Sequence, residues 1–314
     1  MRRHSEQTDR ISGTGAWGGA RRRLRRLASV TLGLSAALAI SLPTMASAPR
    51  ASFTAVAPNF ACTDTMYQQA ASKGITIGIS PDSPYTYLDP KTKQPTGIDW
   101  EINTAALHWM GITKISYQIM PFDSLIPALQ SRRIDVIGDN IHETPARNKL
   151  IGFSSPAWWY GPALIVQKGN PSKITSYADL TKSGVTVGTI TGSAADEYLK
   201  HIGGKMTSFQ DNTSEFLSIV QGRVSVVLED DAKFGAFKKQ NPNAPVEVLA
   251  IPPPQELITT YGYSYARYGL RKDDCTLNFG YTRALAELRA NGPIVAILKK
   301  WGLTSRNLFI PGTF

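Results

Sequence analysis

An arginine at the start of a predicted helix is the residue of this chain best suited to hold a small acid. The stretch 135–147 runs from an apolar strand through polar residues to a Thr144-Pro145 helix start, with Arg147 in the first turn. A guanidinium offers two parallel donors that match the two oxygens of a carboxylate. The free N–H groups and positive dipole end of a helix N-terminus favour the same anion. Arg147 therefore predicts a carboxylate site if it faces a cleft; the alternative is a solvated arginine or a local helix cap.

The basic charge of the chain is concentrated at its N-terminus and does not indicate nucleic-acid binding. The 314 residues carry a net charge of +10. Residues 1–46 hold eight arginines and two acids, a net +6, which leaves +4 (10 − 6) for the remainder. That remainder has no dense basic run, so we expect no nucleic-acid partner.

Residues 1–46 have the order of an export signal. Arginines at 21–26 precede an apolar run at 27–42, and small residues follow. The run is shorter than the roughly 20 residues of a membrane-spanning helix. We expect cleavage after Ala46 and a mature protein that is secreted, periplasmic or held at the cell surface. A twin-arginine route remains an alternative to the general one.

The two cysteines, Cys62 and Cys275, both lie beyond the predicted signal. In an oxidising compartment two cysteines most often pair, and this bridge would tie the start of the mature chain to its C-terminal region. The alternative for Cys62 is lipid attachment, but residues 59–61 lack the leucine expected before a lipidated cysteine. The four histidines are far apart in sequence, so no metal or other cofactor is expected.

Strand and helix patterns alternate along the mature chain. We predict strands at 75–79, 115–119, 134–137, 184–188 and 224–228, helices at 100–109, 122–129, 193–200, 214–221 and within 277–301, and an extended return at 256–271. Repeated βα units predict an α/β protein with parallel sheets flanked by helices. The aromatic stretch 158–162 and the proline-rich stretch 251–254 interrupt the alternation. They predict two lobes, 47–162 plus 256–314 and 163–255.

Seven short motifs, in one order along the chain, resemble those of the extracellular solute-binding proteins of family 3, the receptors of amino-acid ABC importers. They lie at 97–101, 121–129, 144–147, 153–156, 187–193, 222–224 and 299–301. The resemblance implies a two-lobed, type 2 periplasmic-binding-protein fold, each lobe a mostly parallel sheet, joined by a two-strand hinge near 162–166 and 257–266. It also implies a monomeric receptor that captures an amino acid or close analogue and delivers it to an ABC permease in the membrane.

The same resemblance assigns ligand contacts to ten residues: Asp82, Tyr85, Phe122, Asp139, Asn140, His142, Arg147, Gly192, Ser193 and Asp230. Arg147 falls on the clamp for the ligand carboxylate, and Asp230 on the acceptor of its ammonium. Phe122 falls on the stacking ring. The remaining residues lie in three segments: the first hairpin, the polar turn before Arg147, and a turn of the second lobe whose backbone amides would contact the ligand.

Two questions stay open at this level. Excess acid at Asp82, Asp139, Glu143, Glu229 and Asp230 could favour a cationic ligand side chain, unless Glu143 and Glu229 face solvent or cap helices. The aromatic run 158–160 either contacts ligand or packs between the lobes.

The function also has alternatives. A secreted dehydratase or lyase on the same fold would need a general acid or base, for which His142 or Glu143 would serve. A ligand-sensing partner of a membrane receptor would differ only in its docking surface. Since no nucleophile with a paired base is visible, and opposite charges at Arg147 and Asp230 fit an amino acid, we predict a receptor and not an enzyme.

Overall fold

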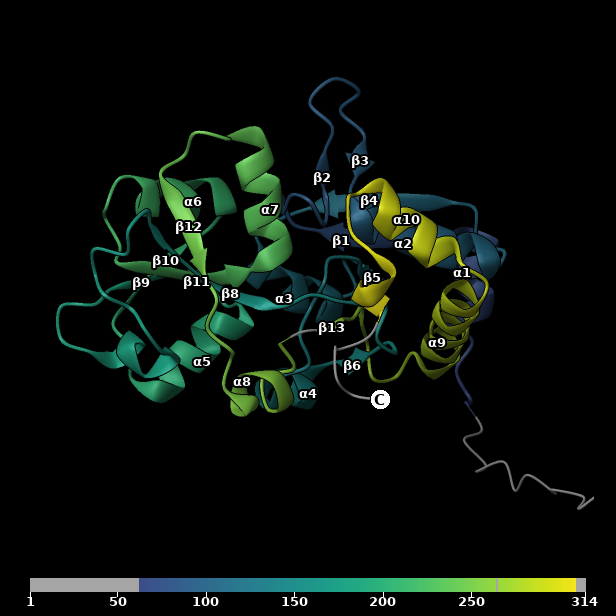
Figure 1. Ribbon diagram of the computed structural model, residues 1–314. Coiled ribbons are helices and arrows are strands. Elements are labelled where there is room, and N and C mark those ends of the chain that lie inside the picture. Colours follow the sequence, from purple (N-terminus) through teal and green to yellow (C-terminus); the bar gives the residue numbers. More distant parts are fainter. Residues whose placement is uncertain (1–61, 264, 309–314) are drawn as a thin grey trace, which may run out of the picture. The chain divides into compact units, whose positions relative to one another are not determined.

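Two five-stranded sheets form the framework of the protein, described here for residues 62–263 and 265–308 of a computed structural model (Figure 1). The first sheet has the order β4 (Ile115–Ile119), β1 (Ile75–Ile79), β5 (Val136–Ile137), β14 (Gly269–Leu270), β6 (Gly152–Phe153). The second has the order β10 (Met206–Phe209), β9 (Val187–Ile190), β11 (Val226–Asp230), β8 (Pro162–Gln167), β12 (Val246–Leu249). The predicted export signal, 1–46, lies outside the described residues.

Each sheet is mixed, with a parallel part and an antiparallel part. β1 pairs in parallel with β4 and β5, and β9 with β10 and β11, as the βα units predict. β14 and β8 run antiparallel to both of their neighbours. These two strands follow the segments that join one sheet to the other and not a crossover helix, so they need not keep the parallel direction.

Helices flank both sheets. On the first are α1 (Met66–Lys73), α2 (Ile98–Trp109), α3 (Leu125–Gln130, after the 3₁₀ turn Phe122–Ser124), α4 (Pro145–Leu150), α9 (Cys275–Ala290) and α10 (Pro293–Lys300). On the second are α5 (Ala194–Ile202), α6 (Asn212–Val220) and α7 (Asp231–Gln240). Shorter pieces are β2 (Tyr87–Leu88), β3 (Pro95–Thr96), α8 (Gln255–Thr259) and the 3₁₀ turns Tyr177–Thr181 and Ser305–Leu308. None of the described helices is long and apolar enough to span a membrane.

The core of the first sheet is built on apolar residues at helical and strand spacing. Ile98, Ile102 and Ala106 recur every fourth residue of α2 and are buried, and so are Ile75, Ile77 and Ile79 of β1. Burying one such isoleucine contributes about 2 kcal/mol. The core therefore fixes the position of β1, and with it the start of the loop that follows at Ser80.

The segments that join the two sheets pair with each other. β7 (Trp158–Trp159) and β13 (Tyr265–Ala266) form a two-stranded antiparallel ladder, with Trp159 opposite Tyr265. β8 begins at Pro162, so the first joining segment ends where the predicted hinge range begins. The predicted extended return is wrong over its first residues, which form α8; Pro254 precedes this helix, where its fixed φ and missing N–H are tolerated.

The predicted disulfide is present. Cys62 and Cys275 are bonded with their Cα atoms 5.4 Å apart, across a sequence separation of 213. The chain-entropy model assigns about 5 kcal/mol to closing so long a loop. Asp64 adds to the junction by accepting hydrogen bonds from the Thr276 amide and hydroxyl. Cys62 is thereby committed to a disulfide and not to lipid attachment.

Candidate ligand-binding site

A narrow cavity lies at the ends of strands from both sheets. It is lined by residues that follow β1, β5 and β9, and by the last residues of β11. Six predicted site residues line it: Asp82, Phe122, Asn140, His142, Ser193 and Asp230. The carboxyl ends of strands are where open α/β sheets place their ligands. The cavity therefore sits where the fold expects a small molecule.

The other four predicted residues surround this cavity without lining it. The Tyr85 hydroxyl donates to Asp230 Oδ2 at 2.9 Å. Asp139 is fully buried and accepts a hydrogen bond from the Ser80 hydroxyl. Arg147 and Gly192 contact each other. These four residues therefore lie behind the residues that line the cavity. Asp139 is held by Ser80, the residue that directly follows β1.

Arg147 connects the two sheets. Thr144 caps α4 by accepting from the Arg147 amide at 3.3 Å, which fixes the arginine in the first turn. Its side chain donates to the carbonyl oxygens of His142 (2.9 Å) and Gly192 (2.7 Å). Its Nε lies 3.3 Å from Glu197 Oε1, and the guanidinium lies over the Phe122 ring, 5.4 Å from the centroid.

The guanidinium is buried and charged. Burial lowers the pKa of Arg147, and the negative charge of Glu197 opposes that shift. An arginine stays protonated at neutral pH. Only three of its five N–H groups are used by the contacts above. The other two N–H groups have no partner among the described residues.

His142 is held by two tyrosines. Its Nε2 lies 2.8 Å from the Tyr160 hydroxyl, and its ring stacks on Tyr263 at 4.4 Å between centroids. Burial, together with the charges of Arg147 and Lys233, lowers the pKa of His142 well below its ordinary value. The imidazole is therefore neutral at physiological pH and serves as a polar wall of the cavity.

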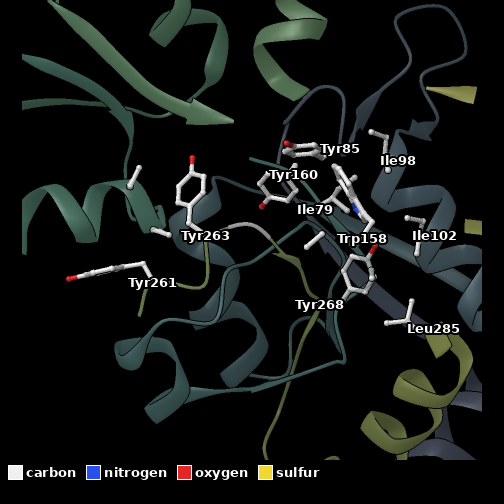
Figure 2. Close-up of a cluster of buried hydrophobic side chains, with 14 of the residues drawn as sticks. Ile79, Tyr85, Ile98, Ile102, Trp158, Tyr160, Tyr261, Tyr263, Tyr268 and Leu285 are labelled. Atoms are coloured by element: carbon white, nitrogen blue, oxygen red, sulfur yellow. The ribbon is translucent and has the colours of Figure 1, made fainter. Parts of the chain in front are cut away.

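The aromatic run 158–160 packs behind the cavity. Figure 2 shows Tyr85, Trp158 and Tyr160 side by side, and their ring centroids lie 5.0 to 5.4 Å apart. Trp158 and Tyr160 are fully buried. The packing alternative for these two rings is correct, and Tyr160 contacts the predicted site residues His142 and Tyr85 from behind.

A lysine that the sequence analysis missed lies among the acids of the cavity. Lys233 Nζ is 3.0 Å from Asp82 Oδ2, 3.1 Å from Glu229 Oε1 and 3.8 Å from Asp230 Oδ2. Burial alone would lower the pKa of Lys233, but these three acids raise it well above its ordinary value. The run of acids just before the lysine was the available signal; Glu229 and Asp230 end strand β11, so helical spacing does not explain the pairing.

Glu143 and Glu229, whose surroundings the sequence left open, differ in their positions. The alternative that Glu229 faces solvent is wrong, because its residue is only 4% exposed and lines the cavity. Glu143 pairs with Arg267 at 3.2 Å and accepts from Asn148 at 3.1 Å, away from the cavity lining. Excess acid in the cavity is therefore real at Asp82, Glu229 and Asp230, but it carries its own counter-ion.

Three buried polar atoms of the cavity have no hydrogen-bond partner among the described residues. They are Asp82 Oδ1, Asp230 Oδ1 and Asn140 Nδ2, two acceptors and one donor. Burial raises the pKa of Asp82 to about 6 and that of Asp230 well above its ordinary value. Buried polar atoms are normally satisfied, so these three are available to complementary groups of a molecule in the cavity.

A buried carboxyl behind the site should make stability depend on pH. Asp99 accepts from the Trp158 indole at 2.8 Å and the Tyr268 hydroxyl at 2.9 Å, yet burial raises its pKa to about 7. Because this pKa exceeds that of the unfolded chain, the stabilisation present at low pH is lost as pH rises towards 7.

We therefore expect Asp99→Asn to flatten the fall in unfolding free energy between about pH 4 and about pH 7, and to be more stable than wild type by roughly 2 kcal/mol at the upper end. Urea denaturation across this range measures it. The exposed Asp273→Asn should keep the wild-type slope, and an unchanged slope in Asp99→Asn would contradict the argument.

Known proteins resemble this chain over most of its length. The family model of the bacterial extracellular solute-binding proteins, family 3, matches residues 75–304. The chain is 26% identical over 234 residues to ABC transporter arginine-binding protein 1 of Escherichia coli (74% of this chain, 92% of the relative). It is 29% identical over 237 residues to the L-arginine-binding protein of Pseudomonas aeruginosa (74% and 89%).

A solved structure gives the same picture in three dimensions. An ancestral arginine-binding protein bound to glutamine is 31% identical and aligns with a TM-score of 0.63, over 72% of this chain and 96% of that one. The two-lobed fold of type 2 periplasmic binding proteins is thus shared with these relatives.

Proposed function

The chain belongs to the bacterial extracellular solute-binding proteins of family 3, and on that premise we propose that it is a secreted receptor for an amino acid, which it delivers to an ABC importer. Both relatives are named as arginine-binding proteins, and the one from Escherichia coli is named as part of an ABC transporter. We propose that it acts as a monomer after loss of the segment 1–46. We propose that its two lobes are 47–162 plus 256–314 and 163–255, as the sequence predicts.

The unsatisfied polar atoms of the cavity carry this proposal. The α-ammonium of an amino acid would bind Asp230 Oδ1, and its carboxylate would bind Asn140 Nδ2 and the free N–H groups of Arg147. The Ser193 turn at the start of α5 would meet the same carboxylate, because helix N-termini favour anions. Phe122, beside the guanidinium, would cover the ligand.

Closure of the two lobes would complete the site. Arg147 follows a strand of the first sheet, and Asp230 ends a strand of the second. A ligand that binds both groups favours the state in which they are close, since only differential contacts shift such an equilibrium. The paired segments β7 and β13 are the proposed hinge.

The enzyme alternative finds less support in the residues that would serve it. His142 is committed to Tyr160 and has a lowered pKa, so it is not a proton donor at neutral pH. Glu143 pairs with Arg267 outside the cavity lining. We therefore propose binding without turnover.

Titration calorimetry of the mature protein against a panel of amino acids tests the proposal. We expect one or a few to bind tightly and to be recovered unchanged from the complex. Chemical conversion of the bound amino acid would overturn the receptor assignment in favour of the enzyme. Absence of binding across the panel would overturn the amino-acid assignment.

A further inference from the structure

We propose that Lys233 is a specificity-determining residue that makes this cleft select amino acids with uncharged side chains over arginine and lysine. The inference rests on the proposed function and names the class of ligand. It departs from the relatives, whose named ligands include arginine.

The ammonium of Lys233 lies where a cationic ligand side chain would find its partners. Lys233 is in the first turn of α7, directly after Asp230, and only 7% of the residue is exposed. Its Nζ lies within 3.1 Å of both Asp82 and Glu229, and 5.3 Å from the centre of the Tyr85 ring. Since Asp82 and Glu229 belong to opposite sides of the cavity, the lysine joins them across it.

The lysine already pairs with both carboxylates of this cluster that the ligand ammonium would leave. With the ligand ammonium on Asp230, the negative charges that remain are Asp82 and Glu229, and Lys233 is bonded to both. A guanidinium could bind only the second oxygen of Asp82, beside the lysine ammonium that repels it, or else displace the lysine. Displacement would leave a buried ammonium without its partners, which is strongly unfavourable.

An acidic ligand side chain is disfavoured by the same arrangement. An ammonium has three N–H donors, and three carboxylate oxygens lie within 3.8 Å of this one. A ligand carboxylate would therefore be repelled by the three acids and would find no free N–H donor on Lys233. An uncharged side chain disturbs none of these pairs.

The charge balance also explains why the cluster can be buried. Asp82, Glu229 and Asp230 would repel one another without an internal cation, and burial already raises the pKa of Asp82. A basic ligand could supply that cation only while bound. In this chain Lys233 supplies the cation permanently, so the buried acids are neutralised even when no ligand is bound.

Calorimetry with three amino acids that differ in side-chain charge tests the inference: L-glutamine, L-glutamate and L-arginine. For wild type we expect glutamine to bind at least about tenfold more tightly than either of the others. In Lys233→Met, which keeps the length of the side chain and removes its charge, we expect the glutamine-to-arginine affinity ratio to shift towards arginine by about tenfold or more.

Two matched variants separate charge from other effects. Lys233→Arg keeps a cation at the site and should retain the preference for glutamine over arginine. Lys239→Met makes the same replacement at an exposed position of α7 and should bind all three amino acids as wild type does.

The outcomes distinguish this inference from the proposed function. Wild type that binds arginine as tightly as glutamine overturns the inference and leaves the amino-acid receptor standing, and so does an unchanged ratio in Lys233→Met. No binding of any amino acid overturns the receptor proposal, and the inference with it. If Lys233→Met does not fold, judged by circular dichroism, the wild-type ratio and Lys233→Arg decide.

Discussion

Arg147→Ala should weaken amino-acid binding by roughly a thousandfold, about 4 kcal/mol, because the ligand carboxylate would lose its buried cation. The variant should also lose some stability. Wild-type Arg147 donates to the carbonyl oxygens of His142 and Gly192 and pairs with Glu197, so its removal breaks contacts that join the two sheets. Calorimetry and urea denaturation measure the two effects separately.

Two further variants assign the loss to the guanidinium. Arg147→Lys keeps the charge but not the two parallel donors, so we expect an intermediate affinity. Arg267→Ala removes another arginine that pairs with a glutamate, at a position outside the cavity lining, and should bind normally. If Arg147→Ala folds and binds like wild type, Arg147 is a structural tie between the sheets and not a ligand clamp.

Asp230→Asn should weaken binding to a similar extent, roughly a thousandfold, because an amide cannot replace the charge that holds the ligand ammonium. Folding should survive. The asparagine can still accept from the Tyr85 hydroxyl, and the pKa of Asp230 is already raised by burial and by Glu229. A group with a raised folded-state pKa destabilises the fold when it ionises, so a neutral replacement costs little stability at neutral pH.

The neighbouring acid offers a matched control. Asp231 accepts from the Gly161 amide at 3.2 Å, does not line the cavity, and keeps that acceptor in Asp231→Asn. Binding should then be unchanged. Wild-type affinity in Asp230→Asn would instead show that the ammonium binds elsewhere, and Asp82, with its own unsatisfied oxygen, would be the next candidate.

Local patterns predicted the elements that carry the site. β1 and β4 have the predicted bounds, and α4 begins at Pro145, after the N-cap Thr144, as these two residues indicate. Strand β8 was missed, because a short apolar run such as 162–167 has no period that separates a buried strand from a linker. The parallel βα units were predicted and the antiparallel strands were not, because strand direction depends on where the chain returns.

The sequence by itself determined the family, the two-lobed α/β fold, the disulfide between Cys62 and Cys275, and the placement of Arg147 in a capped first turn. Each of these follows from local spacing or from ordered motifs. Only the tertiary structure decided what the charged groups meet: Arg147 against Gly192 and Glu197, and Lys233 among acids from both sides of the cavity. The reason is that charge pairing depends on distances across the fold, which no period along the chain records. Arg147 thus joins the two sheets and is also the proposed partner of the ligand carboxylate. Lys233 determines which ligand side chains we expect the cavity to accept.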